Sequence, residues 1–244
     1  MSLGIYLYGI FPEAVSENVI LEGLDKQTVK SYSLDGFNFL YSEAKQKKYF
    51  ASRRNLLCHE KVLEEAMSQG FRTHLPLRFG LVVKTWDTVN EQLLVPYKEE
   101  LEALFQKLDG RREVSVKVIW NSQEEIQALL ESNPQLREKR DAMEGKTLKM
   151  EEVIDIGQMI EKGLQVRKEA IIQTFQDELN GLAEEVLENV PMTEEMIYNT
   201  AYLIPWDSES IFSEKVESID KKFSDRLRIR YNNFTAPYTF AQLS

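Results

Sequence analysis

An apolar stripe at helical spacing runs through the second half of the chain. Its members recur three, four or seven residues apart: Val153, Ile156, Ile160, Leu164, Ile171, Phe175, Leu179, Leu182, Val186 and Val190. This spacing predicts a helical segment of about 40 residues, which would reach roughly 60 Å if it were unbroken. Gly157, Gly163 and Gly181 predict a bend within it. A single small sheet cannot cover such a stripe, so part of it could offer a groove to a partner helix, the alternative being that all of it is core.

Three β-prone segments accompany this stripe. Glu113–Trp120 comes first and has an apolar residue at every second position, and Met196–Ile204 and Leu227–Tyr231 follow the stripe. A helical run over Ser208–Phe223 separates the last two segments. The order strand–helix–strand–helix–strand predicts a ferredoxin-like (split βαβ) fold with a long helical crossover. We therefore assign residues 111–244 to a C-terminal ferredoxin-like domain with a long helical insertion and an extended aromatic tail.

The first half, residues 1–110, predicts an N-terminal α+β domain. Gly4–Ile10 is apolar on both faces, which is typical of a central strand. Asp35-Gly36 between two β-prone runs predicts a hairpin turn. Pro76, within a further β-prone run, predicts an edge position, a bulge or a strand start. Helices are predicted at Arg53–Ser68 and Thr88–Leu108. The expected fold class is α+β, with two domains that each pack a small mixed or antiparallel sheet with helices.

Charge and composition limit the range of functions. The chain has 40 acidic residues against 30 basic ones, which gives a formal net charge of −10. Binding to nucleic acid or to anionic lipid depends on basic residues, so we expect neither nucleic acid nor a lipid membrane as a partner. Cys58 is the only cysteine, which excludes an internal disulfide and a multi-cysteine metal site. No secretory signal or membrane-spanning stretch is evident, which predicts an intracellular, cytoplasmic protein.

The motifs that could carry catalysis or hold a cofactor are incomplete. Cys58 and His59 are adjacent, but neighbours on a helix point about 100° apart, so they do not form a nucleophile–base pair. His59 also begins a His-Glu-x-x-His pattern, in which Leu63 replaces the second histidine. Gly145-Lys146-Thr147 resembles the end of a phosphate-binding loop, in which Arg140 replaces the required glycine. We predict no catalytic, cofactor-binding or metal-binding residue and no cofactor.

Two features are candidates for binding a partner. Three arginines alternate along the last predicted strand, which would place their side chains on one face: Arg226, Arg228 and Arg230. They would either pair with carboxylates of this acidic chain or form a basic strip for the acidic surface of a partner. The tail from Asn232 onward is too apolar to remain in water and is expected to dock through its aromatic residues: Phe234, Tyr238 and Phe240.

Several segments also share a family pattern. The most specific is a helical segment followed by a Pro-Leu-Arg-Phe-Gly strand, Arg54–Glu64 and then Leu75–Gly80. Others follow in the same order along nearly the whole chain: Gly4–Ile10, Glu113–Val118, Ala201–Ile204 and Leu227–Ile229. Together they resemble the gas vesicle protein F/L family. The tail departs from the family's Gly-Pro-Trp-Pro-Pro-Tyr-Ser-Phe ending, because it keeps Pro237, Tyr238 and Phe240 but lacks the glycine, the tryptophan and the other prolines.

The resemblance implies a non-enzymatic, minor gas vesicle component that acts in vesicle assembly. Its partners would be the small hydrophobic shell protein and other gas vesicle accessory proteins, and it would reside at the gas vesicle. Two alternatives from other classes stay open. One is a ferredoxin-like regulatory or small-molecule-binding module, and the other is an enzyme that uses His59 and Arg78.

Overall fold

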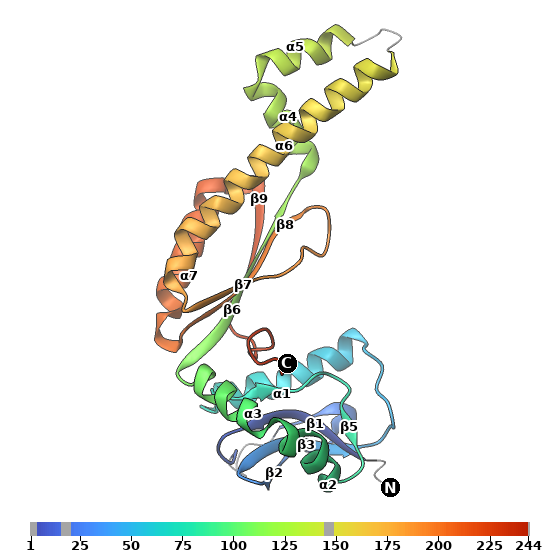
Figure 1. Cartoon of the computed structure of the whole chain (residues 1–244), viewed down its shortest axis with the longest axis vertical. Coiled ribbons are helices and arrows are strands. Elements are labelled where there is room, and N and C mark those ends of the chain that lie inside the picture. The colour runs from blue at the N-terminus through green and yellow to red at the C-terminus, as the bar shows by residue number, and fades with distance from the viewer. Residues whose placement is uncertain (1–3, 16–20, 144–148, 244) are drawn as a thin grey trace. The chain divides into compact units, whose positions relative to one another are not determined.

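The computed structural model describes residues 4–15, 21–143 and 149–243 of the 244-residue chain. The protein has the predicted α+β class, with two sheets that are each packed with helices (Figure 1). The chain divides into two compact units: a first unit of Met1–Val114, Leu203–Asp207 and Asn233–Ser244, and a second of Ser115–Tyr202 and Ser208–Asn232. This division assigns the C-terminal tail to the first unit. The domains predicted at 1–110 and 111–244 stay a prediction.

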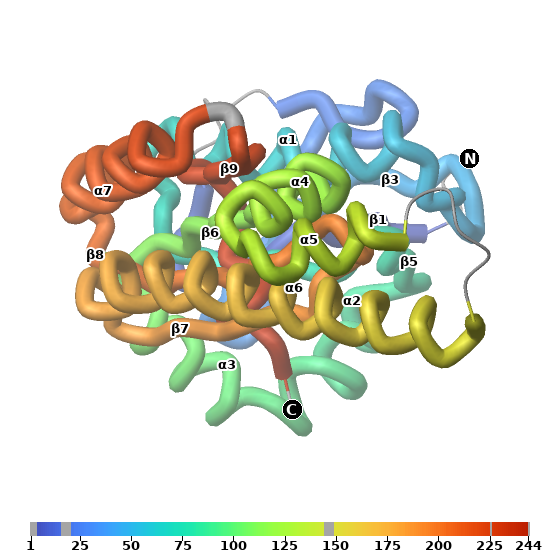
Figure 2. Tube along the Cα trace, turned by 90° about the horizontal axis from the view of Figure 1, so that it is seen from above, coloured from blue at the N-terminus to red at the C-terminus, as the bar shows by residue number. Residues whose placement is uncertain are grey.

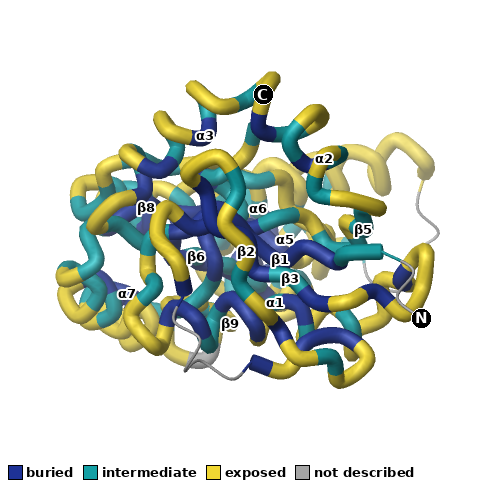
Figure 3. The backbone as a smooth tube through the Cα atoms, turned by 90° about the horizontal axis from the view of Figure 1, so that it is seen from below, coloured by how far each residue is buried: buried dark blue, intermediate teal, exposed yellow. Residues whose placement is uncertain are grey.

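The first unit is built on a five-stranded sheet around β1 (Gly4–Phe11). The strand order is β2-β3-β1-β4, and β5 also pairs with β1. The partners are β2 (Lys30–Leu34), β3 (Phe37–Ala44), β4 (Leu75–Pro76) and β5 (Val82–Val83). β1 runs antiparallel to β3, β4 and β5. Every residue of β1 from Tyr6 to Phe11 is buried, which confirms the predicted central strand (Figure 3).

A two-residue turn at Asp35 and Gly36 joins β2 to β3. The φ angles are 48° at Asp35 and 86° at Gly36. Both lie in the left-handed region, as the tight hairpin turns that fit twisted strands require. Leu34 and Phe37 face each other directly across the turn. The Asp-Gly signal therefore predicts this hairpin correctly.

Helix α1 (Arg53–Ser68) has the bounds that the sequence predicts. Its first turn is capped by Ser52, whose side chain accepts a hydrogen bond from the backbone N–H of Asn55. Gly70 follows the helix with φ 104°. The helix packs closely on β1, because a Cβ at Gly9 would lie only 2.8 Å from Cδ2 of Leu63.

A second helical segment of the first unit changes its winding before Pro96. It consists of α2 (Trp86–Val89), a π-helical stretch (Asn90–Leu94) and α3 (Val95–Leu108). Proline has no N–H to donate and its ring crowds the preceding turn, so a wider turn accommodates it at the start of α3. The helix predicted at Thr88–Leu108 therefore continues past its proline with a local π-turn.

The second unit contains most of a four-stranded sheet with the order β7-β8-β6-β9. The strands are β6 (Arg111–Trp120), β7 (Glu185–Glu188), β8 (Met196–Pro205) and β9 (Leu227–Asn232). β6 and β9 run antiparallel, with Val118 opposite Ile229. Helix α7 (Glu209–Phe223) connects β8 to β9 through a short 3-10 turn, Ser224–Arg226. The ferredoxin-like description of this region stays a prediction.

The long helix of the second unit is shorter than the sequence predicts. Helix α6 (Met150–Leu179) has 30 residues and continues through Gly157 and Gly163. The predicted extension to Val190 is wrong, because a 3-10 turn at Asn180–Leu182 ends the helix and β7 follows. A short strand with an apolar residue at Val186 fits the same spacing as one more helical turn, so periodicity does not separate the two.

The N-terminal half of α6 packs with two shorter helices, α4 (Ser122–Ser132) and α5 (Pro134–Met143), as Figures 1 and 2 show. They share a small apolar cluster around Leu129, Leu130 and Leu136. A Cβ at Gly163 of α6 would lie 2.7 Å from Cδ2 of Leu129, so glycine allows the close approach of α4. Part of the long apolar stripe therefore packs within its own unit.

Glu125 of α4 ties three elements of the second unit together. Its side chain is only 2% exposed. Oε2 accepts a hydrogen bond from Nε of Arg167 in α6 at 2.9 Å, and both carboxylate oxygens accept from Nη2 of Arg226 at 2.9 and 3.0 Å. A buried carboxylate is stable when it is paired and hydrogen-bonded in this way.

Candidate functional site

Opposite β1, the chain between β4 and β5 leaves the sheet. Gly9 pairs with Pro76 and Tyr6 pairs with Val82. Between these pairs β1 has two residues, Leu7 and Tyr8, whereas the facing chain has five, Leu77–Leu81. The surplus residues must bulge out of the ladder. We name Leu77–Leu81 the bulge segment, and it contains most of the Pro-Leu-Arg-Phe-Gly block.

Backbone hydrogen bonds fix both ends of the bulge segment to β1. The N–H of Leu77 donates to the carbonyl of Tyr8 at 2.9 Å, and the N–H of Leu7 donates to the carbonyl of Leu81 at 3.1 Å. Gly80 has φ 90°, a conformation that glycine adopts without the steric cost of a side chain. The bulge segment is therefore hydrogen-bonded to β1 at both of its ends.

Two buried side chains, those of His59 and Tyr6, form hydrogen bonds to the backbone of the bulge segment. The imidazole of His59 donates from Nε2 to the carbonyl of Leu77 at 3.0 Å, and its Nδ1 accepts from the hydroxyl of Tyr6 at 2.9 Å. The same hydroxyl accepts from the N–H of Gly80 at 3.0 Å. These three bonds form one relay that reaches the bulge segment at two points.

The relay requires a neutral His59. Burial lowers the pKa of His59 to about 4, against the opposing effect of the hydrogen bond to the Leu77 carbonyl. Burial is also the largest cause that raises the pKa of the Cys58 thiol. Cys58 is thus not activated as a nucleophile, and both ring nitrogens of His59 are engaged within the protein.

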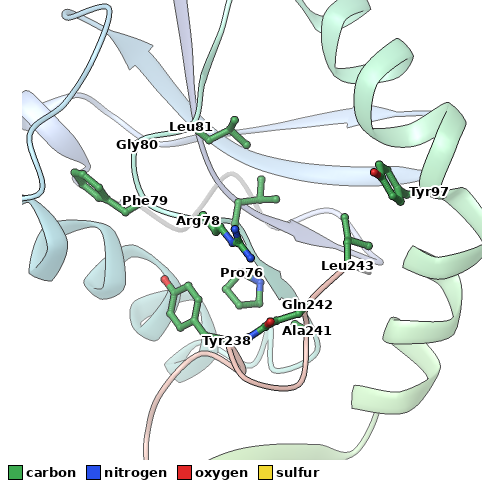
Figure 4. Close-up of a pocket in the computed structure, with 11 residues that line it drawn as sticks. Pro76, Arg78, Phe79, Gly80, Leu81, Tyr97, Tyr238, Ala241, Gln242 and Leu243 are labelled. Carbon is green, nitrogen blue, oxygen red and sulfur yellow. The ribbon is translucent and has the colours of Figure 1, made fainter. Parts of the chain in front are cut away.

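A groove with a volume of about 660 Å³ lies between the bulge segment and the C-terminal tail. This volume is within the range of about 300–1,000 Å³ that is usual for ligand sites. Figure 4 shows its side chains, which come from three segments of the first unit: Pro76–Leu81, Tyr97 of α3, and the tail residues Tyr238, Ala241, Gln242 and Leu243. Most of these side chains are apolar or aromatic, and Arg78 is the charged one.

The tail is fastened to the first unit through its own aromatic and polar residues. Phe240 is 3% exposed, and Nζ of Lys107 lies 5.3 Å from its ring centroid. The carboxylate of Glu113 accepts from the N–H of Thr239 at 2.8 Å and from its hydroxyl at 2.7 Å. Burial raises the pKa of Glu113, while these bonds lower it. The tail therefore docks on the unit to which it belongs.

The predicted partner-binding residues of the tail differ in accessibility. Phe234 and Tyr238 are half-buried against the apolar core of the first unit, and the guanidinium carbon of Arg112 lies 5.7 Å from the ring centroid of Phe234. Tyr238 lines the groove, whereas Phe240 is enclosed. Their role in binding a partner stays a prediction.

The three candidate arginines do not share one environment. Arg226 lies in the 3-10 turn before β9 and pairs with Glu125, so its predicted place on the strand is wrong. Arg228 and Arg230 are exposed on β9, opposite Ile119 and Lys117 of β6. Within the described part of the chain, neither of these two forms an ion pair. The structure thus assigns a structural contact to Arg226 and leaves two arginines at the surface.

Sequence reasoning missed the bulge segment as a site. Pro76 is a signal for a bulge, but the groove also needs Tyr97 and the tail, which are distant in the sequence. The phosphate-loop-like residues Gly145–Thr147 lie outside the described residues. Among the described residues, no group of three or more His, Cys, Asp or Glu could hold a metal ion. None of the helices described is both long and apolar enough to cross a bilayer.

Known proteins resemble this chain in sequence and in overall fold. The family described as gas vesicle synthesis protein GvpL/GvpF matches residues 4–242. Gas vesicle protein F of Nostoc sp. is 68% identical over 244 residues, which cover 100% of both chains. The crystal structure of GvpF from Anabaena sp. is 65% identical with a TM-score of 0.86, covering 99% of this chain and 97% of that one. That of GvpF from Microcystis aeruginosa is 61% identical with a TM-score of 0.86, covering 99% and 100%. The chain belongs to the GvpL/GvpF family of gas vesicle proteins.

Proposed function

We propose that this protein is a non-enzymatic, minor gas vesicle component that acts in vesicle assembly by binding the hydrophobic shell protein. It would also bind other gas vesicle accessory proteins and would reside at the vesicle after an earlier cytoplasmic stage. The observation that carries the proposal is the groove, which offers apolar side chains to a partner on a firmly hydrogen-bonded backbone. A prefixed apolar groove binds with little loss of conformational entropy.

The polar groups around the groove support a binding role over a catalytic one. His59 is 2% exposed and uses both of its nitrogens within the fold. The Tyr6 hydroxyl likewise has partners in His59 and Gly80. These groups maintain the shape of the groove and do not line it.

Co-purification with the shell protein from vesicle-forming cells tests the proposal. We expect Leu81→Asp to reduce recovery of the shell protein, because Leu81 lines the groove and is 36% exposed. Phe50→Asp is the matched control, since Phe50 is 78% exposed in the same unit and outside the groove lining. Absence of the shell protein from the wild-type preparation, together with normal vesicles after deletion of the gene, would refute the proposed function.

A further inference from the structure

The groove contains a positively charged residue, Arg78, that forms no ion pair or hydrogen bond within the described part of the protein. Arg78 is exposed. Its neighbours in the bulge segment are nevertheless fixed, Leu77 by its N–H and its carbonyl and Gly80 by its N–H. The buried relay of His59 and Tyr6 thus fixes the backbone at Leu77 and Gly80, on either side of Arg78, while the guanidinium of Arg78 stays exposed.

The rest of the groove lining carries no charge. Apart from Arg78, its side chains are apolar, aromatic or an amide. Among the described residues, no carboxylate forms an ion pair with Arg78. The groove therefore has one unpaired positive charge, at the bulge segment. Apolar side chains complete its lining: Leu77, Phe79, Leu81 and Leu243.

We propose that this groove binds an apolar segment of a partner protein that carries one aspartate or glutamate, and that Arg78 pairs with its carboxylate. The inference rests on the proposed function, because it specifies what the groove recognises in the shell protein. A planar guanidinium matches a carboxylate with two parallel hydrogen bonds. Because the rest of the lining carries no charge, a second carboxylate would be buried there without a partner, which restricts the segment to a single carboxylate at Arg78.

An array of short synthetic peptides of random sequence, probed with the purified full chain, tests the inference without the shell protein. We expect the bound peptides to be enriched in one Asp or Glu flanked by apolar residues. Arg78→Gln should lower their affinity by about tenfold or more, the usual effect of losing a hydrogen bond between charged groups. Arg78→Lys should retain part of the affinity, and replacing the peptide carboxylate by its amide should reproduce the loss.

Lys84→Gln is the control, because Lys84 is an exposed cation of the same unit that does not line the groove. Thermal unfolding of each variant checks that the fold is intact. Peptide selection without acidic enrichment, or equal binding by wild type and Arg78→Gln, would overturn the inference. If the peptide experiment fails in either way but the wild-type protein still captures the shell protein, the proposed function is supported and only the inference about Arg78 is refuted. Acidic enrichment that depends on Arg78, without capture of the shell protein, supports the inference and refutes that partner.

Discussion

The imidazole Nε2 of His59 lies 3.0 Å from the carbonyl oxygen of Leu77, across 18 positions of sequence. His59 belongs to α1 and Leu77 to the bulge segment, so this bond connects a helix to a segment that bulges out of the sheet. Tyr6 continues the connection, because its hydroxyl bonds both His59 and Gly80. The shape of the groove therefore depends on two buried side chains that do not line it.

Removal of the Tyr6 hydroxyl should loosen the bulge segment. Tyr6→Phe leaves the Gly80 N–H without its acceptor and His59 Nδ1 without its donor. Two buried groups that lose their partners should lower the free energy of unfolding by about 2 kcal/mol. Urea denaturation would measure the loss, and amide exchange should show faster exchange at Gly80.

Tyr41→Phe is the control for this variant, since the Tyr41 hydroxyl has no hydrogen bond among the described residues. A substitution of this kind should change the free energy of unfolding by less than about 0.5 kcal/mol. A Tyr6→Phe variant with the stability and the Gly80 exchange rate of wild type would contradict the role of the relay.

Acidification should destabilise the fold through its two histidines. Burial lowers the pKa of both His59 and His74 from 6.5 to about 4. Below pH 6.5 the unfolded chain binds more protons than the folded chain, so the stability present above that pH is lost as the pH falls towards 4. Each histidine contributes up to about 3 kcal/mol. Urea denaturation between pH 7 and pH 5 would measure the slope, and His59→Gln should make it shallower.

The buried carboxylate of Glu125 should be among the most sensitive positions of the second unit. Glu125→Ala leaves Arg167 and Arg226 without their shared partner. Breaking a buried pair costs about 3–5 kcal/mol. Because Arg226 is 48% exposed, water can take over part of its interaction, and we expect the lower end of that range. Chemical denaturation would measure it.

Glu131→Ala is the control for Glu125→Ala, because Glu131 lies at an exposed position of the same helix. An exposed substitution of this kind should cost less than about 0.5 kcal/mol. Equal losses of unfolding free energy in the two variants would be evidence against a stabilising role of the Glu125 ion pairs.

Docking of the tail should depend on Glu113. Glu113→Ala removes the acceptor for the N–H and hydroxyl of Thr239. The loss of these bonds should weaken docking by about 1–3 kcal/mol. Glu113→Gln retains an oxygen for the N–H and an amide group for the hydroxyl, so it should stay docked. Limited proteolysis after Tyr238 would report release of the tail, and equal resistance of the alanine variant and wild type would show that Phe240 alone retains the tail.

The exposed arginines of β9 should behave differently from Arg226. Double charge reversal at Arg228 and Arg230, which are both exposed, should change the free energy of unfolding by no more than about 0.5 kcal/mol. Arg226→Glu should instead destabilise the second unit, because it places a second carboxylate beside Glu125. If the two exposed arginines form the predicted basic strip, the double variant should also recover less partner protein in co-purification. Normal recovery by a folded double variant would remove the strip from the list of interaction surfaces.

Local signals in the sequence predict the elements that local chemistry determines. The predicted bounds of helix α1 match the structure, because the apolar period ends just before Gly70 and Ser52 supplies a cap. The hairpin at Asp35 and Gly36 follows from the need for positive φ at both turn residues. The sequence does not reveal β7, because its Val186 continues the apolar spacing of α6.

The candidate site could not be predicted in the same way. The length of the bulge segment is defined by its pairing with β1, and neither strand reveals the register alone. The bond between Glu113 and Thr239 joins residues 126 positions apart, a separation that propensity and periodicity do not address. Sequence reasoning named Arg78 within a family motif and in the enzymatic alternative, but not as an unpaired cation, because that state depends on the absence of a neighbouring carboxylate in space.

The close approach of Gly163 to Leu129 couples the packing of α4 on α6 to the ion pairs of Glu125. Glu125 and Leu129 are one turn apart on α4, so a shift of the helix at Leu129 also shifts the carboxylate of Glu125. A methyl group added at position 163 would lie 2.7 Å from Cδ2 of Leu129, so the Leu129 side chain or α4 itself would have to move. If α4 moves, the carboxylate of Glu125 moves away from both arginines, so a purely steric change on α6 would weaken the ion pair that holds the 3-10 turn before β9.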